Sequence, residues 1–160
     1  MAEGKFKFKK LALGGTFDIL HKGHEKTLLE AFNLSEKVLI GLSTDALVKS
    51  LKKHEVNPYE YRKKVLEEFL SERGFIGRFQ IVPIDNRFGI AHIVKDLDAI
   101  MVSNETVYIA EEINRIREIN GLKRLEIVLI EKVKAENGKP ISSTRIRAKE
   151  IDREGRLRKG

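Results

Sequence analysis

Short, mostly apolar runs alternate along the chain with longer stretches in which apolar residues recur at every third or fourth position. The short runs predict buried strands, and the longer spacing predicts helices that bury one face. Strands are expected at residues 6–13, 38–42, 79–84, 99–102 and 125–130. Helices are expected at residues 24–34, 45–51, 57–74, 90–96, 106–120 and 143–154.

One helix start carries a nearly complete signal in the sequence. Asn57-Pro58-Tyr59-Glu60 offers an asparagine for the N-cap, a proline for the first helical position and a glutamate for the third. A capping side chain and a glutamate three residues later can satisfy each other's backbone N–H groups. The pattern therefore predicts that Asn57 caps this helix in a capping box.

The order of the elements predicts the fold class. Strands and helices alternate, and near-continuous apolar strands are typical of a parallel sheet covered on both faces. We expect an α/β, Rossmann-like, doubly wound fold with a five-stranded parallel sheet. The 160 residues suit a single domain, with a core over about 6–150 and a basic tail over about 151–160. Such sheets bind ligands at the carboxyl ends of their strands.

The positive charge of the chain gathers at its two ends. The net charge is +7, of which residues 1–10 carry +3 and residues 145–160 carry +4, while residues 11–144 are balanced. Basic ends are often only solvated. With 7% aromatic residues and no tryptophan, the chain also offers little surface for stacking bases. We therefore expect no nucleic acid as its main partner.

The composition excludes several other classes of protein. The absence of cysteine excludes disulfides, thiolate zinc sites, iron–sulfur clusters and cysteine nucleophiles. The sequence shows neither an apolar run long enough to cross a membrane nor a secretory leader, so we expect no membrane partner and a cytoplasmic location.

The first candidate site is the string from Gly14 to His24, between a strand and a helix. Paired glycines permit a sharp turn and a close approach of backbone to a ligand. A helix start presents unpaired N–H groups, which suit a phosphate. His21 and His24 share a helical face, so both imidazoles and the Thr16 hydroxyl can converge on one oxyanion. Gly23 leaves room for a flat base against the backbone.

Other interpretations of this string stay open from the residues alone. A Gly-Gly pair can be only a turn, and two histidines at this spacing can be an ordinary surface pair. Asp18, His21 and His24 also offer a set of zinc ligands, although no cysteine or further residue completes it.

The second candidate site is the string from Ile141 to Arg147, at the start of the last expected helix. Ser142, Ser143 and Thr144 offer three hydroxyls beside backbone N–H groups, and Arg147 lies within reach of the same anion. The alternative is simple capping of the helix. Both strings follow strands of one parallel sheet, which favours a shared phosphate site.

Common nucleotide and hydrolase motifs are absent: the sequence contains no Walker A motif, no G-x-G-x-x-G and no G-x-S-x-G. Gly15-Thr16-Phe17-Asp18 with His21-x-Gly23-His24, and Ile141-Ser142-Ser143-Thr144-x-x-Arg147 near the end, instead resemble the T/H-x-G-H nucleotidyltransferase superfamily. The resemblance covers about residues 10–150.

Three further segments narrow the resemblance within that superfamily. Val38 to Asp45, Asn57-Pro58-Tyr59-x-x-Arg62, and Val102-Ser103-Asn104-Glu105-Thr106 are similar to archaeal-type phosphopantetheine adenylyltransferases, which are related to a domain of eukaryotic CoA synthase. The bacterial branch carries an arginine pair where this chain has Ser103 to Thr106. The resemblance therefore implies that other groups hold the phosphates here.

The resemblance implies an activity: adenylyl transfer from ATP to 4′-phosphopantetheine, giving dephospho-CoA and pyrophosphate. It implies catalytic roles for Thr16, His21, His24 and Lys49, the last near the acceptor phosphate. Mg²⁺ is expected to be carried with ATP, without a metal cage in the protein. The implied nucleotide-binding residues are Gly15, Thr16, Phe17, Asp18, Gly23, His24, Ser142, Ser143, Thr144 and Arg147.

Rival functions remain at this point. A related adenylyltransferase or cytidylyltransferase would use another phosphate acceptor, such as FMN, NMN or glycerol phosphate. A protein of a different class would bind nucleotide or RNA through the basic ends without catalysis. The sequence leaves the oligomeric state open.

Overall fold

A computed structural model of the chain describes residues 6–51 and 55–130. The strands are β1 (Phe8–Gly15), β2 (Ser35–Ser43), β3 (Phe79–Ile84), β4 (Ala99–Ser103) and β5 (Glu126–Ile130). The helices are α1 (Lys22–Leu34), α2 (Asp45–Leu51), α3 (Tyr59–Glu72) and α4 (Val107–Ile119). The expected helix at 143–154 lies outside the described residues, so that prediction and the single-domain boundaries stay untested.

The described strands form one parallel five-stranded sheet in the order β3-β2-β1-β4-β5, with β1 at its centre. The chain first moves outward from β1 to β3 and then returns to place β4 on the other side of β1. The direction of winding therefore reverses at β1 and β4, which is where doubly wound sheets bind their ligands. The predicted fold class is confirmed.

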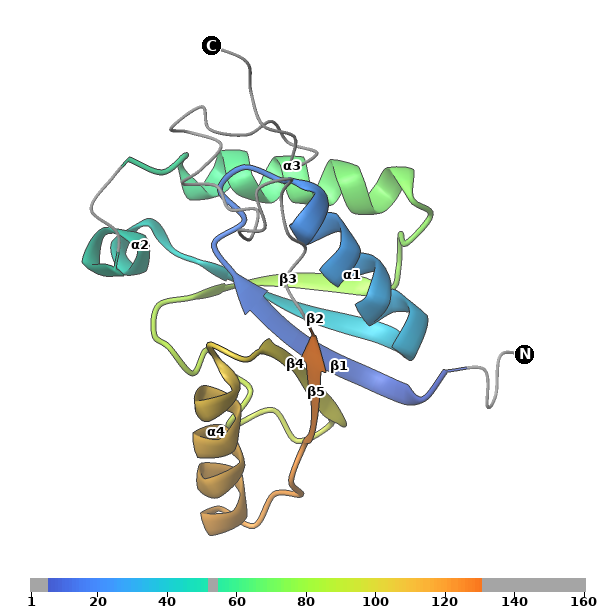
Figure 1. Ribbon diagram of the computed structural model, residues 1–160, viewed down its shortest axis with the longest axis vertical. Coiled ribbons are helices and arrows are strands. Elements are labelled where there is room, and N and C mark those ends of the chain that lie inside the picture. The colour runs from blue at the N-terminus through green and yellow to red at the C-terminus, as the bar shows by residue number, and fades with distance from the viewer. Residues whose placement is uncertain (1–5, 52–54, 131–160) are drawn as a thin grey trace.

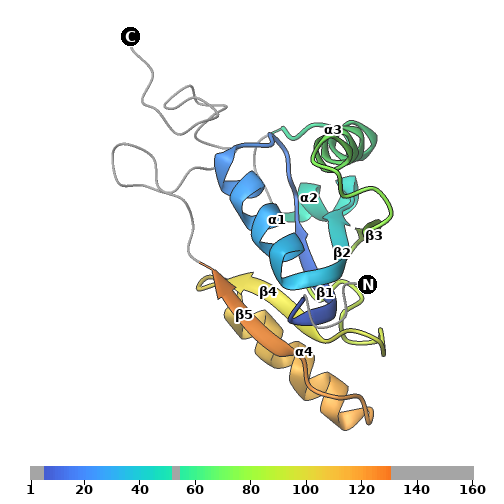
Figure 2. The same cartoon turned by 90° about the vertical axis from the view of Figure 1, so that its right-hand side faces the viewer.

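Helices cover both faces of this sheet (Figures 1 and 2). Alternate residues along each strand point to opposite faces, so Leu11 and Leu13 of β1 pack in the core beneath α1 and α3. Ala12, between them, packs with Ile113 of α4 in a second core on the other face. This double burial explains why the strands are apolar runs rather than alternating ones.

The two central strands stay together over only part of their length. β1 pairs with β2 as far as Gly15, but it pairs with β4 only at Leu11 and Ala12. β4 itself continues to Ser103, paired with β5. Beyond Ala12 the sheet therefore divides between β1 and β4, and this division leaves space at its carboxyl edge.

Two expected elements differ from the structure. The N-cap of α3 is Pro58, which has no side-chain cap, and the side-chain amide of Asn57 instead donates to the carbonyl of Asp18. Residues 90–96 form turns rather than a helix. The buried guanidinium of Arg117, on α4, donates hydrogen bonds to the backbone carbonyls of Ala91 and Val94. In a regular helix these carbonyls would accept from backbone N–H groups four residues later.

No helix in the described part of the chain has the length and apolar character needed to span a bilayer.

Candidate active site

The loop between β1 and α1 begins with an unusual backbone conformation. Phe17 has a φ of 48°, in the left-handed region that non-glycine residues seldom adopt. Its ring is buried, and it packs edge-on against His24 with 5.1 Å between ring centroids. A side chain on Gly15 would meet this ring at 3.1 Å. The loop therefore depends on Gly15 to bring Thr16 and Phe17 beside the start of α1.

His21 and His24 form a capping box at the start of α1. The Nδ1 atom of His21 accepts hydrogen bonds from the backbone N–H groups of Gly23 and His24, and Nδ1 of His24 accepts from the N–H of His21. The two rings stack with 3.7 Å between centroids. Since Nδ1 accepts in both neutral rings, the ring proton is on Nε2, which makes each Nε2 a donor. This is the tautomer that a phosphate oxygen requires.

The helix start also explains Gly23. A side chain there would lie 2.9 Å from the His21 ring, which is too close for any substituent. We expected the space beside Gly23 to admit a nucleotide base, but the imidazole of His21 occupies it. Gly23 thus permits the capping box, and any contact with a base must come from another direction.

Asp18 ties the loop to the segment that precedes α3. Its buried carboxylate accepts a 2.9 Å hydrogen bond from the backbone N–H of Asn57, and its carbonyl accepts from the Asn57 side-chain amide at 3.3 Å. These bonds turn the backbone and the side chain of Asn57 toward Asp18, and α3 begins one residue later, with Pro58 as its N-cap.

Arg62 of α3 also stabilises the loop after β1 and the segment before α3. Its side chain is fully buried, and it donates to the carbonyls of Thr16 and Ser43 through one nitrogen, at 2.9 and 2.8 Å. It donates to the Asn57 carbonyl at 2.7 Å and to the Asp45 carboxylate at 2.9 Å through its other nitrogens. One guanidinium thus fixes the carboxyl ends of β1 and β2 relative to α3.

From the sequence, Arg62 was known only as part of a segment similar to the archaeal family, and its structural role was not predicted. A signal was present, because Arg62 precedes Leu66 and Leu70 by four and eight residues and so lies on the buried face of α3. A charged residue on an apolar helical face must find partners, but the sequence does not reveal which carbonyls these are.

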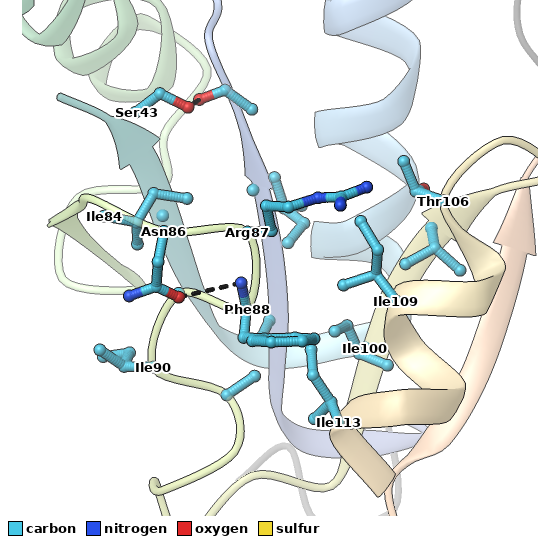
Figure 3. A pocket seen from close by; sticks show the side chains of 18 of the residues that line it. Ser43, Ile84, Asn86, Arg87, Phe88, Ile90, Ile100, Thr106, Ile109 and Ile113 are labelled. Atoms are coloured by element: carbon cyan, nitrogen blue, oxygen red, sulfur yellow. Dashed lines mark hydrogen bonds between the residues drawn. The ribbon is translucent and has the colours of Figure 1, made fainter. Parts of the chain in front are cut away.

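A cavity of about 380 Å³ opens where β1 and β4 separate, on the face of the sheet that α4 covers (Figure 3). Its floor is the carboxyl half of β1 to β4, and its walls are α2, α4 and the loop after β3. Gly14 and Gly41 lie opposite each other in register on this floor, where neither adds a side chain. Apolar side chains, among them Phe88, Ile100 and Ile113, line most of the rest.

The cavity adjoins the first motif. Gly14 and Gly15 line it, and Thr16 follows directly at the end of β1. A ligand in the cavity would therefore extend toward the loop that carries Thr16 and His24. The structure places a ligand-sized apolar space beside a helix start with imidazole donors.

Arg87 and Tyr108 face each other across the cavity. Arg87 lies in the loop after β3, and its guanidinium donates a hydrogen bond to the hydroxyl of Tyr108 in the first turn of α4. The guanidinium carbon also lies 5.5 Å from the centre of the Tyr108 ring. Figure 3 shows the Arg87 side chain extending toward α4 and Thr106.

The remaining expected residues lie elsewhere. Lys49 is exposed on α2 and does not line the cavity, although Leu47 and Leu51 of the same helix do. The second motif, with Ser142, Ser143, Thr144 and Arg147, lies outside the described residues. Its expected convergence with His24 is therefore untested.

The described residues contain no group of three or more histidine, cysteine, aspartate or glutamate side chains that could hold a metal ion. Asp18, which the sequence offered as a ligand beside His21 and His24, instead binds Asn57. The donors near the loop are hydroxyl, imidazole and backbone groups. These groups donate hydrogen bonds to phosphate oxygens, whereas Mg²⁺ prefers carboxylate, phosphate and water oxygens as ligands.

Comparison with known proteins identifies relatives over nearly the whole length. Residues 12–149 match the family model described as cytidylyltransferase-like. A phosphopantetheine adenylyltransferase from Methanosarcina barkeri is 46% identical over 153 residues, which cover 94% of this chain and 93% of the relative. One from Pyrococcus abyssi is 46% identical over 147 residues, which cover 91% and 93% respectively.

Solved structures show the same architecture. A protein of unknown function from Archaeoglobus fulgidus superposes with a TM-score of 0.69 at 30% identity, and the match covers 83% of this chain and 99% of that one. A putative nicotinate-nucleotide adenylyltransferase from Vibrio parahaemolyticus superposes with a TM-score of 0.57 at 19% identity, covering 91% and 89%. The second likeness concerns the fold alone.

Proposed function

This chain belongs to the phosphopantetheine adenylyltransferases of the cytidylyltransferase-like family, and we propose that its cavity and the loop from Gly15 to His24 form the active site. The enzyme is a nucleotidyltransferase that transfers the adenylyl group of ATP to 4′-phosphopantetheine. The products are dephospho-CoA and pyrophosphate, in a step of CoA biosynthesis.

The reaction is a single displacement at phosphorus. An oxygen of the acceptor phosphate attacks the α-phosphorus of ATP and forms a new P–O bond. The bond from the α-phosphorus to the bridging oxygen of the β-phosphate breaks, and pyrophosphate leaves with that electron pair. The attacking phosphate is already an anion, so catalysis consists of positioning and charge stabilisation.

The residues of the loop divide these tasks. Thr16 orients the attacking phosphate, and the Nε2 donors of His24 and His21 stabilise charge on the α- and β-phosphate oxygens. The capping box supports this role, because it fixes both tautomers before substrate binds. Gly15 and Phe17 shape the adenosine side, and Asp18 keeps the loop in place through Asn57.

Groups outside this loop complete the proposal. Ser142, Ser143 and Thr144, with Arg147, bind the β- and γ-phosphates. Mg²⁺ bound to ATP neutralises part of the phosphate charge, and we assign it no ligand among the described side chains.

The apolar cavity beside Thr16 is the observation that carries the choice of acceptor. A pantetheine arm is a flexible chain with apolar segments, and a cavity lined mainly by aliphatic and aromatic side chains suits it. NMN and FMN instead present a charged or flat polar ring.

The experiment offers ATP with one acceptor at a time and measures release of pyrophosphate. 4′-Phosphopantetheine should give the highest kcat/KM, and reactions without acceptor serve as the control. A preference for FMN or NMN would overturn the proposed acceptor.

A further inference from the structure

Arg87 is the one charged residue among the described residues that line the cavity. It is exposed at the cavity's edge, in the loop after β3. Gly15 lines the same cavity and directly precedes Thr16, so the cavity that Arg87 borders reaches the carboxyl end of β1 beside the reacting loop. A positive charge beside mostly apolar walls indicates a ligand with one anionic end.

The other polar side chains of the cavity are already engaged. Asn86 accepts a hydrogen bond from the backbone of Phe88, Ser43 contacts the carbonyl of Gly15, and Thr106 bonds with Ser103. These contacts within the protein use much of the hydrogen-bonding capacity of those side chains. They leave Arg87 as the strongest source of donors for a ligand.

The hydrogen bond to Tyr108 orients the Arg87 guanidinium but uses only part of its hydrogen-bonding capacity. Tyr108 offers a neutral hydroxyl, and the contact uses one nitrogen of a group with five N–H donors. A guanidinium binds phosphate more strongly than it binds a neutral hydroxyl, because the bonds are charge-assisted and can be bidentate. An arriving phosphate can therefore take Arg87 from Tyr108, or share it.

Building on the proposed function, we propose that Arg87 binds the phosphate of the acceptor and makes the enzyme select a phosphorylated acceptor. The family resemblance implied this role for Lys49, which is exposed and does not line the cavity. Arg87 meets the acceptor phosphate from the β3 side while Thr16 meets it from β1. ATP, bound at the histidines, does not contact Arg87.

The test compares Arg87→Gln with the wild-type protein in steady-state kinetics. The KM for 4′-phosphopantetheine should rise about tenfold or more, as expected when a hydrogen bond to a charged group is lost, and the KM for ATP should stay unchanged. Inhibition by pantetheine, which lacks the phosphate, should not change. Lys95→Gln removes one exposed positive charge from the same loop and should leave all three values unchanged.

Four outcomes would overturn this inference. The first is an unchanged KM for the acceptor in Arg87→Gln. The second is an equal rise in the KM for ATP, which would assign Arg87 to the triphosphate. The third is an equal loss of pantetheine binding, which would assign it to the arm. The fourth is a rise in the KM for 4′-phosphopantetheine in Lys49→Gln but not in Arg87→Gln.

The activity of the wild-type protein shows whether a failed test overturns the role of Arg87 or the proposed function as well. If the wild-type protein released no pyrophosphate with 4′-phosphopantetheine, both would be overturned. Any of the four outcomes above, with an active wild type, overturns the role of Arg87 alone.

Discussion

His24 caps α1, and the proposed function gives the same side chain a second task. Its Nδ1 atom accepts from the backbone N–H of His21, so the ring proton is on Nε2, the atom that donates to phosphate in the proposed function. The cap is a local interaction within four residues. Its loss should therefore affect stability modestly, whereas loss of the donor should affect catalysis strongly.

We expect His24→Ala to fold and to lower kcat by about 10²–10³, the usual loss for one preorganised donor. The free energy of unfolding should fall by about 1 kcal/mol through the weaker cap. Pyrophosphate release measures the first effect, and urea unfolding the second. His24→Gln, which keeps a side-chain N–H, should retain more activity. An unchanged kcat in His24→Ala would remove this residue from the mechanism.

Arg62 acts on the site through the backbone. Its replacement by methionine keeps much of the volume but leaves the carbonyls of Thr16 and Ser43 without their donor. We expect the free energy of unfolding to fall by about 3–5 kcal/mol, as when one partner of a buried charged network is removed.

Urea unfolding measures the effect of Arg62→Met. Lys64→Met on the exposed side of the same helix is the matched control, and it should shift stability by less than about 0.5 kcal/mol. Equal, small shifts in both variants would show that the network around Arg62 contributes little.

At the scale of elements, the sequence predicted the helices and strands that depend on local patterns of apolar residues. The five strands and the helices α1 to α4 follow from apolar runs and spacing, and the string from Gly14 to His24 begins at the cavity, as Gly14 and Gly15 line it. The predictions for Asn57 and for residues 90–96 were wrong. Asn57 donates hydrogen bonds to the distant Asp18, and the carbonyls of Ala91 and Val94 accept from the distant Arg117.

The same reason limits what the sequence shows of the site. The role of His21 as a cap depends on a ring orientation, and the position of Arg87 beside Tyr108 depends on two elements meeting across the sheet. Neither contact leaves a pattern along the chain. The chemistry of the loop was predictable, but its supporting contacts were not.

Asp98, directly before β4 at the amino edge of the sheet, connects β1 to the loop that precedes β5. Its carboxylate accepts from the backbone N–H groups of Lys9 and Lys10 and from the side chain of Lys123. Partial burial raises the pKa of Asp98, but the bonds from Lys123 and from the two backbone groups outweigh it, so its pKa is lowered. The carboxylate thus stabilises the fold above its unfolded pKa of about 3.9.

This stabilisation should be lost as the pH falls through the lowered, folded-state pKa of Asp98. We expect the wild-type protein to lose more stability than Asp98→Asn between about pH 5 and pH 2, since the asparagine cannot titrate. Urea midpoints across this range measure the difference. Asp96→Asn, two residues away and exposed, is the control. Parallel profiles for wild type and Asp98→Asn would contradict the role of the carboxylate.

At the scale of the whole molecule, the proposed site uses residues from both ends of the sequence. The first motif follows β1, and the second lies after β5, at residues 141–147. The proposed function brings both motifs to the carboxyl edge of the sheet, where parallel sheets bind their ligands. ATP would then be held by groups more than a hundred residues apart.

Ser143→Ala tests this arrangement. We expect ATP to bind about tenfold more weakly, because one hydroxyl donor to a phosphate oxygen is lost. The acceptor should bind as before. Calorimetric titration of each substrate gives both affinities. Intact ATP affinity would mean that the serine only caps a helix.

The short pairing of β1 with β4 has a consequence for dynamics. Within the paired strands, only Leu11 and Ala12 of β1 are in register with β4, and the contacts of Asp98 with Lys9 and Lys10 add to this seam at the amino edge. This seam should open more readily than the sheet on either side of it unfolds, and its amide protons should exchange with solvent sooner than those between β1 and β2. A substrate that fills the cavity touches both sides of the seam, so its arrival would close the seam and slow that exchange.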